Sequence, residues 1–257
     1  MKEYRTIRMY SEQLSMEKRL YVYLPRSYES SEKFYPVLYM HDGQNLFDDR
    51  IAYQRRGWRI MELYEEYPDI PEVIIVGIES DITRNNQLIP YPFQLPNSKK
   101  VLGGQADLYL DFIVQTVKPY IDQRFRTYKN RKNTAIMGSS FGGVNSLYAS
   151  CKYTDTFARI ASLSGAFHFD FFEPLKQDVL DADFSSMKKI YMDCGTNETD
   201  NVAENKRYIE RNQELVTMIQ KKTDTSQFQF QMIEGGIHHE TDWEKRFPDI
   251  MRFLFND

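Results

Sequence analysis

A glycine-rich segment in the middle of the chain has the residue types of a nucleophilic serine site. Gly138-Ser-Ser-Phe-Gly-Gly143 contains the pattern G-x-S-x-G with Ser140 at its centre, directly after the apolar run Thr134–Met137 and directly before a helical pattern. In this setting a sharp turn holds the serine hydroxyl clear of the sheet, and the flanking glycines let strand and helix pass closely. The first N–H groups of the helix face a developing oxyanion. Ser140 is therefore the candidate nucleophile, against the alternative of an ordinary glycine-rich loop.

A serine hydroxyl is a weak nucleophile and needs a general base, for which the chain offers four histidines. The chain order serine, acid, histidine that accompanies this turn excludes His41. His168 comes too early and lies among phenylalanines, which is typical of a packing or cleft-lining residue. His238 and His239 follow the last apolar run, where the base belongs, and spacing alone leaves the choice between them open.

The acid that would orient this histidine must lie between Ser140 and the histidine pair. The segment after the apolar run Lys189–Met192 supplies two candidates, Asp193 and Glu198, with Asp200 a weaker third. Most acidic residues only solvate a surface, so composition favours neither of the first two.

The loop after the early apolar run Pro36–Met40 is expected to supply half of an oxyanion hole. It reads His41-Asp42-Gly43-Gln44, and its glycine lets the backbone turn its amides inward. The predicted oxyanion donors are the backbone N–H groups of Gln44 and Phe141.

The elements that must position these residues alternate between strand and helix patterns. Alternating polar and apolar residues predict an antiparallel hairpin over Thr6–Leu14 and Lys18–Leu24. Short apolar runs predict strands covered on both faces: Pro36–Met40, Val73–Gly77, Thr134–Met137, Ile160–Leu163, Lys189–Met192 and Phe228–Ile233. Helical patterns lie between them: Trp58–Tyr67, Gln105–Phe125, Gly142–Tyr153, Ala203–Lys221 and Thr241–Phe255.

Together with the serine turn, this alternation predicts an α/β-hydrolase fold with a mainly parallel central sheet, an antiparallel N-terminal hairpin and helices on both faces. In such a sheet the chemistry is expected at the carboxyl ends of the strands.

The composition predicts one globular domain over residues 1–257, with 41% hydrophobic and 27% charged residues. The net charge of −4 argues against nucleic-acid binding, and no apolar stretch has the length of a membrane helix. Cys151 and Cys194 are far apart, and the first residues lack the apolar stretch of a signal peptide, so a reduced, cytoplasmic protein is expected. No motif requires a metal or an organic cofactor, and the aromatic content is compatible with a homodimer.

The segment Ser80–Gly104 is long and follows a strand on the predicted crevice side. Loops of this length are usually functional or disordered. We expect it to form a lid or a wall of the acyl pocket, with Arg84 contacting an anionic or hydroxylated substrate. Asp42, from the oxyanion loop, is a further predicted substrate contact.

Four motifs together resemble the putative esterase family, which contains enterobactin-type siderophore esterases, feruloyl esterase domains, esterase D and mycolyltransferases. They cover nearly the whole chain and are Met40-His-Asp-Gly-Gln-Asn45, Gly138-Ser-Ser-Phe-Gly-Gly143, Asp193-Cys-Gly-Thr-Asn-Glu198, and Gly235-Gly-Ile-His238 followed by Trp243. In feruloyl esterase relatives the acid ends the Cys-Gly-Thr-Asn stretch, which implies Glu198 ahead of Asp193, although Glu here replaces the commoner Asp. The relatives' catalytic histidine precedes a tryptophan by five positions, which implies His238. Their Asp-Gly-x loop likewise points to Gln44.

These residues predict a serine carboxylic-ester hydrolase that acts on a small to medium ester through a Ser-His-acid triad and an acyl-enzyme. The same triad could pass the acyl group to an alcohol, which would make the chain an acyltransferase. A non-catalytic binding protein on a hydrolase fold is the other alternative. The substrate pocket of this fold is built from variable loops, so the sequence does not identify the ester.

Overall fold

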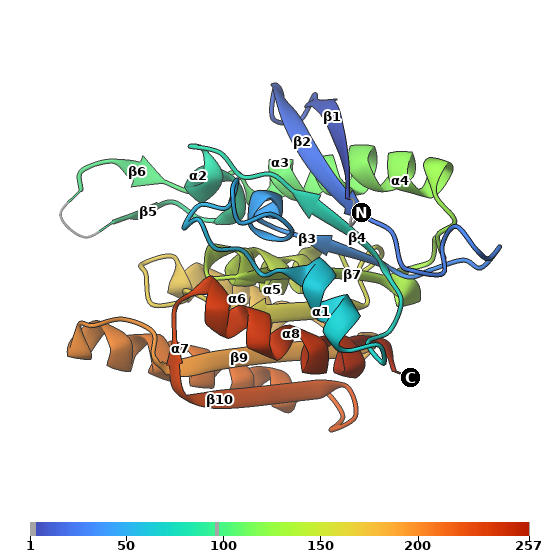
Figure 1. Ribbon diagram of the computed structural model, residues 1–257. Coiled ribbons are helices and arrows are strands. Elements are labelled where there is room, and N and C mark those ends of the chain that lie inside the picture. Colours follow the sequence, from blue (N-terminus) through green and yellow to red (C-terminus); the bar gives the residue numbers. More distant parts are fainter. Residues whose placement is uncertain (1–3, 96–97, 257) are drawn as a thin grey trace.

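The computed structural model describes residues 4–95 and 98–256, and within these ranges the fold is built on an eight-stranded sheet (Figure 1). The strands lie in the order β1 (Arg5–Ser11), β2 (Met16–Tyr23), β4 (Ile74–Ile78), β3 (Val37–Met40), β7 (Thr134–Ser139), β8 (Arg159–Leu163), β9 (Lys189–Asn197) and β10 (Phe228–Ile237). β1 pairs antiparallel with β2, and β2 pairs antiparallel with β4. The pairs from β4 to β10 are parallel. The predicted mainly parallel sheet with an antiparallel N-terminal hairpin is confirmed.

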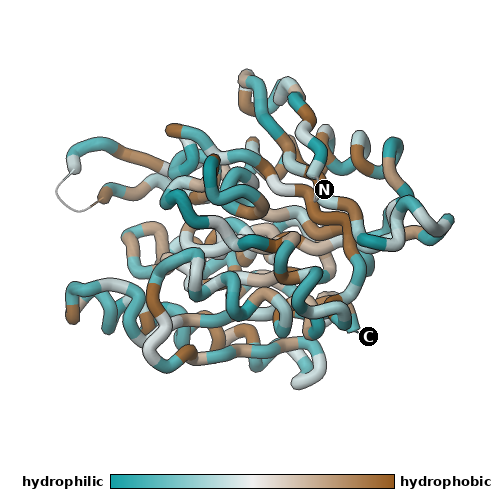
Figure 2. The backbone as a smooth tube through the Cα atoms, in the orientation of Figure 1, coloured by the Kyte–Doolittle hydropathy of each residue, from teal (hydrophilic) through white to brown (hydrophobic). Residues whose placement is uncertain are grey.

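Helices cover both faces of this sheet (Figure 1). One face packs against α1 (Ile60–Glu66) and α8 (Glu240–Phe255), through a buried cluster that includes Trp58, Trp243 and Phe247. The larger cluster on the other face includes residues of α3 (Ala106–Asp111), η2 (Phe112–Val117), α4 (Lys118–Arg124), α5 (Phe141–Lys152), α6 (Phe172–Asp181) and α7 (Val202–Gln220). Figure 2 shows hydrophobic strands in the interior and hydrophilic segments on the outer helices and loops. The central strands are therefore buried on both sides, as their continuous apolar sequence predicts.

Three connections differ from the expected pattern. The single helix predicted over Gln105–Phe125 is divided into α3, the π-helical segment η2 and α4. The segment Ser80–Gly104 contains a short helix and a two-stranded sheet that extends from the body of the molecule, and its residues 96–97 lie outside the described ranges (Figure 1). Helix α6, between β8 and β9, was not predicted. The short elements are η1 (Gly43–Asn45), α2 (Arg84–Leu88), β5 (Phe93–Gln94), β6 (Val101–Leu102) and η3 (Arg131–Asn133).

The parallel strands carry the candidate site residues at their carboxyl ends. Ser140 follows β7, Glu198 follows β9 and His238 follows β10. Because parallel strands end at one edge of the sheet, these three positions come from distant parts of the sequence to the same side. Across residues 4–95 and 98–256, no helix combines the length and apolar character needed to cross a membrane. Cys151 and Cys194 are free thiols.

Candidate active site

Ser140 lies at the sharp turn between β7 and α5. Its backbone has φ 59° and ψ −124°, a conformation that residues with a side chain rarely adopt. The Ser140 N–H donates to the carbonyl of Leu163 (3.0 Å), and the Ser140 carbonyl accepts from the N–H of Ala166 (3.3 Å). Backbone strain of this kind costs about 1–3 kcal/mol and persists where the surroundings enforce it. Here the end of β8 and the residues after it hold the turn.

The glycines on either side of Ser140 are required by close packing. A Cβ atom at Gly138 would lie 2.6 Å from Cδ2 of His41 and 2.8 Å from the carbonyl carbon of Gly142. A Cβ atom at Gly142 would lie 3.1 Å from Cβ of His41. Strand β7, helix α5 and the loop after β3 therefore approach so closely that larger side chains do not fit.

His238 and Glu198 are in direct contact. Nδ1 of His238 lies 2.7 Å from Oε2 of Glu198, and the Glu198 side chain is fully buried. Its other oxygen accepts the backbone N–H of Gly195 at 2.5 Å. Burial favours the neutral carboxyl, but the hydrogen bond and charge of His238 outweigh burial and lower the pKa of Glu198. Glu198 is therefore positioned as a carboxylate that holds one nitrogen of the imidazole.

Two aromatic residues complete the surroundings of this imidazole. The hydroxyl of Tyr208 donates to the carbonyl of Ser164 and also lies 3.3 Å from Nδ1 of His238. The indole of Trp243 meets the imidazole edge to face, with ring centroids 5.0 Å apart at 88°. The indole N–H in turn donates to Oγ of Ser164 (3.0 Å). Ser164 therefore anchors both aromatic neighbours of His238.

Asp193, the alternative acid, makes its contacts elsewhere. It is completely buried, and its Oδ2 lies 2.9 Å from Nε of Arg246. It also accepts the N–H of Ser164 (2.8 Å) and the hydroxyl of Tyr191 (3.1 Å). Burial raises the pKa of Asp193 to about 6, although the charge of Arg246 opposes this. The structure thus brings Glu198 to the histidine and Asp193 to a structural ion pair behind it.

The other three histidines have separate environments. His41 is buried, its Nδ1 lies 2.9 Å from the hydroxyl of Tyr109, and burial lowers its pKa to about 3. Nε2 of His168 lies 3.1 Å from Glu204, and burial lowers the pKa of His168 to about 4. His239 precedes α8 and its ring accepts the N–H of Thr241. Their partners differ from those of the His238–Glu198 pair.

The predicted oxyanion loop forms the 3₁₀ turn η1. Gly43 packs directly on the neighbouring strand β4, because a Cβ atom there would lie 2.5 Å from the carbonyl carbon of Gly77. The side chain of Gln44 accepts the N–H of Ser80 (2.9 Å). Gln44 and Phe141 are among the first residues of η1 and α5, where backbone N–H groups have no acceptor within their own helix. Both predicted donors thus come from helix starts next to the turn at Ser140.

Arg84 and Asp42, the two predicted substrate contacts, bind each other. Nε and Nη2 of Arg84 donate to the two carboxylate oxygens of Asp42 at 2.6 and 2.7 Å. Burial opposes ionisation, but Arg84 outweighs it and lowers the pKa of Asp42. The guanidinium also lies 5.7 Å from the ring centroid of Phe141. Two of the N–H groups of Arg84 are therefore already engaged within the protein.

A cavity of about 590 Å³ joins these parts of the site. Its lining includes Ser140 and His238 together with Asp42, Gln44 and Arg84. Further lining comes from Asn45, Ile51, Tyr53, Gln54, Ser80, Asp81, Ile82, Asn85, Ser139, Glu240 and Trp243. The predicted nucleophile, the predicted base and Gln44, one of the two predicted oxyanion donors, thus border one space of the size that takes a small molecule.

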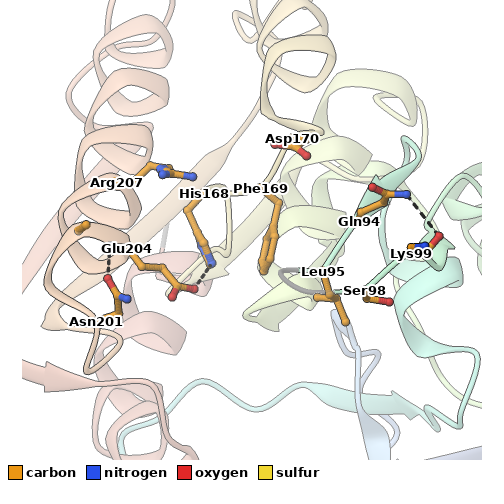
Figure 3. Close-up of a pocket in the computed structure, with 11 residues that line it drawn as sticks. Gln94, Leu95, Ser98, Lys99, His168, Phe169, Asp170, Asn201, Glu204 and Arg207 are labelled. Atoms are coloured by element: carbon orange, nitrogen blue, oxygen red, sulfur yellow. Dashed lines mark hydrogen bonds and ion pairs between the residues drawn. The ribbon is translucent and has the colours of Figure 1, made fainter.

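A second cavity, of about 750 Å³, is lined by residues that include His168, Phe169 and Arg207 (Figure 3). Figure 3 shows Phe169 and His168 in its wall, between helix α7 and the β5–β6 segment. Phe169 packs against Phe141 with ring centroids 5.4 Å apart, and His168 stacks on Tyr208 at 4.5 Å. The segment Ser80–Gly104, which was expected to form a lid or a pocket wall, lines both cavities. Ser80 and Arg84 line the first cavity, and Gln94 and Lys99 line the second.

Tyr208 and Glu240 are two of the site residues that were not predicted from the sequence. Tyr208 lies within α7, and no motif marks it. Glu240 follows the histidine pair directly, and its place next to His239 was the one signal that could have found it. For the residues that the structure describes, no group of three or more His, Cys, Asp or Glu side chains could hold a metal ion.

The serine turn, the parallel sheet and the helices on both faces define an α/β-hydrolase fold. The chain belongs to the putative esterase family, whose pattern it matches over residues 11–254. This confirms the resemblance seen in the sequence motifs, and the class of reaction that the family supports is ester hydrolysis.

Individual relatives are distant but match almost the full chain. The uncharacterized protein YbbA of Bacillus subtilis is 25% identical over 252 residues, which are 95% of each chain. An IroE-like serine hydrolase from Shewanella oneidensis is 24% identical with a TM-score of 0.79, covering 99% of this chain and 80% of that one. The enterobactin esterase from Shigella flexneri is 16% identical with a TM-score of 0.77, covering 99% of this chain and 59% of that one. At these identities the structural likeness supports the fold.

Proposed function

We propose that this chain is a serine carboxylic-ester hydrolase with Ser140 as nucleophile, His238 as base and Glu198 as acid. The observation that carries this proposal is the 2.7 Å contact between Nδ1 of His238 and the buried carboxylate of Glu198, at a cavity that Ser140 also lines. A carboxylate on Nδ1 fixes the tautomer in which Nε2 is free to take a proton.

The reaction proceeds in two balanced steps. The Ser140 oxygen attacks the ester carbonyl while Nε2 of His238 takes the hydroxyl proton, and the tetrahedral intermediate then expels the alcohol, which receives that proton. Water attacks the resulting acyl-enzyme, gives its proton to His238 and releases the acid, and the proton returns to Ser140. Glu198 stabilises the imidazolium in both steps without itself being protonated.

The oxyanion that forms in each step needs two donors, and the backbone N–H groups of Gln44 and Phe141 serve this purpose. Each belongs to the first turn of a helix, and the packing of Gly43 on Gly77 fixes the position of the η1 turn. Donors held in place before the reaction cost no reorganisation at the transition state. The reaction uses no metal and no organic cofactor in this proposal.

The decisive experiment is the replacement of the nucleophile. Ser140→Ala should lower kcat on p-nitrophenyl acetate by roughly four to six orders of magnitude, because the whole triad acts through this oxygen. Ser150→Ala is the matched control, since Ser150 is a buried serine of helix α5 that donates to the Leu147 carbonyl near the far end of that helix. A fluorophosphonate probe should label the wild type and the control, and leave Ser140→Ala unlabelled.

An unchanged rate in Ser140→Ala, with the fold intact by circular dichroism, would remove the proposal. The same assay with added glycerol separates hydrolysis from transfer, because an acyltransferase would form acylated glycerol in place of free acid.

A further inference from the structure

The carboxylates that line the catalytic cavity differ in whether a cation neutralises them. Asp42 is paired with Arg84, and Asp81 lies 2.7 Å from Nζ of Lys18, a lysine that is almost fully buried. The third carboxylate is Glu240, and among the ion pairs of residues 4–95 and 98–256 none includes it. Glu240 is therefore the one carboxylate of the cavity lining that has no ion-pair partner among the described residues, although Arg84, His238 and His239 lie near enough to act on it electrostatically.

The surroundings of Glu240 make this charge costly. The residue is only 6% exposed. Among the described residues its carboxylate accepts a hydrogen bond from one other side chain, Nδ2 of Asn45 at 3.5 Å, which is long, and it also interacts with its own backbone N–H. Burial and, to a smaller extent, the nearby Asp42 raise the pKa of Glu240 above its ordinary value. Its position as the first residue of α8 favours a negative charge but supplies no counter-ion. Buried carboxylates in proteins are normally paired with a cation or take up a proton, so an ionised Glu240 would be stabilised by a cation bound in the cavity.

The exposed residues that line the same cavity are mostly apolar, with Gln54 as the polar exception. Ile51, Tyr53 and Ile82 line it, and they are 43%, 83% and 103% exposed. Exposed apolar side chains around a floor with a few polar groups are typical of a small-molecule site. The ligand that fits this combination has an apolar body and a compact polar group that reaches Glu240.

We propose that Glu240 binds a primary ammonium group on the substrate, so that the natural ester is cationic. This inference rests on the proposed esterase function, because it assigns the non-reacting part of the ester cleaved at Ser140. An ammonium group supplies both the missing charge and three hydrogen-bond donors, whereas a hydroxyl group supplies no charge. An anionic substrate would be repelled by a charged Glu240. It would also lack the bidentate hydrogen bonds of Arg84, because Nε and Nη2 of Arg84 already donate to Asp42.

The kinetic test compares esters of equal length that differ in one terminal group. The first set is aminopentyl, hydroxypentyl and hexyl acetate, which carry the group on the alcohol. The second set is the p-nitrophenyl esters of aminohexanoic, hydroxyhexanoic and heptanoic acid, which carry it on the acyl chain. In one of the two sets, the wild type should prefer the ammonium ester over the alkyl ester by about 10- to 100-fold in kcat/KM, the value of a charge-assisted hydrogen bond.

In Glu240→Gln this preference should fall to within a few-fold of unity, mainly through KM. Glu234→Gln is the matched control, since Glu234 is an exposed glutamate on β10 outside the cavity lining, and it should keep the wild-type preference. The assignment is overturned if the wild type handles alkyl or hydroxyl esters as well as ammonium esters in both sets. It is also overturned if Glu240→Gln keeps the preference. The wild-type comparison stands even if the Glu240 variant does not fold.

A binding measurement separates this inference from the esterase proposal. Pentylammonium chloride is titrated by calorimetry into Ser140→Ala and into the double variant with Glu240→Gln, with pentanol as the neutral probe. Saturable heat with pentylammonium in the first protein only supports the ammonium site, whatever the hydrolysis rates are. No heat, or equal heat in both proteins, overturns the site even if Ser140 is the nucleophile.

Discussion

Glu198 and Asp193 are buried carboxylates five positions apart, and their neighbours give them opposite pKa shifts. Asp193 lies in the middle of β9, and Glu198 directly follows that strand. The imidazole of His238 lowers the pKa of Glu198 against the effect of burial. Burial dominates at Asp193 and raises its pKa to about 6 in spite of Arg246. A group that stabilises an imidazolium has to be charged and in contact with the ring. Glu198 meets both conditions, whereas the carboxylate of Asp193 is paired with Arg246.

The role of this acid is tested by removing its charge while keeping its size. Glu198→Gln should lower kcat by about 10³- to 10⁴-fold with a smaller change in KM, because an amide no longer fixes the tautomer of His238 or stabilises its protonated form. Ester hydrolysis at pH 8 measures the effect. Asp193→Asn should retain a much larger part of kcat at the same pH. The assignment is wrong if the two variants show the reverse order.

At the residue scale, the sequence could predict those site residues whose position along the chain is set by a motif. Ser140 follows from G-x-S-x-G, and the order serine, acid, histidine restricted the base to His238 or His239. The choice between Glu198 and Asp193 depended on the family resemblance, because both follow the same apolar run, Lys189–Met192, in the sequence. Tyr208 and Glu240 contact the site from helices, and a helical residue shows nothing in the sequence about which cavity it faces.

At the element scale, helix α8 is attached to the sheet through a buried network. Arg246 on α8 forms the ion pair with Asp193 on β9, and its Nη2 also donates to Oγ of Ser164 after β8 (3.2 Å). Ser164 Oγ accepts the indole N–H of Trp243, which packs on His238. The ion pair therefore connects the stability of the helix to the position of the imidazole.

This network predicts a stability loss that depends on pH. The folded-state pKa of Asp193 is about 6, above its ordinary value of 3.8. Asp193 therefore loses its proton as pH rises through about 6, and above that pH its buried negative charge depends on Arg246 for a partner. Arg246→Met should therefore lower the free energy of unfolding by about 3–5 kcal/mol at pH 8, the cost of an unpaired buried charge, and by clearly less at pH 5. Urea denaturation at both pH values measures the difference.

Arg252→Met is the control on the same helix. Arg252 pairs with Asp69, which is 63% exposed at its side chain, so this variant should lose about 1 kcal/mol or less at pH 8. Equal losses for Arg246→Met at pH 5 and pH 8 would show that the charge of Asp193 does not drive the effect.

Strands were predicted more reliably than connections, for a physical reason. A strand buried on both faces needs a continuous apolar run, and Val37–Met40 and Ile74–Ile78 lie within or next to such runs. The π-helical segment η2 has the same apolar spacing as the helices around it, so the sequence predicted one continuous helix. The β5–β6 pair depends on contacts with the body of the molecule, and local sequence does not encode these.

At the scale of the whole molecule, the strand order interleaves the chain. β3 and β4, from the first third, lie between the N-terminal hairpin and β7, and the last strand β10 forms the far edge. Hydrophobic clusters on both faces use the same strands, because alternate side chains point to opposite sides. The single domain predicted for residues 1–257 should therefore unfold as one cooperative unit, since neither face keeps its strands when the other is lost.

The position of the tryptophans makes this cooperativity measurable. Trp58 and Trp243 both belong to the cluster on the α1–α8 face, with ring centroids 6.1 Å apart, so their fluorescence reports on that face alone. Phe112→Ala removes a fully buried side chain from the opposite face and should cost about 3–5 kcal/mol. In urea, the fluorescence and far-ultraviolet circular dichroism transitions of this variant should shift together by the same amount. Phe247→Ala, on the tryptophan face, should shift both probes in the same way. The prediction of one unit is wrong if Phe112→Ala shifts only the circular dichroism transition and leaves the fluorescence midpoint unchanged. The tryptophan face would then stay folded without the helices on the other side, and the two faces would be separate folding units.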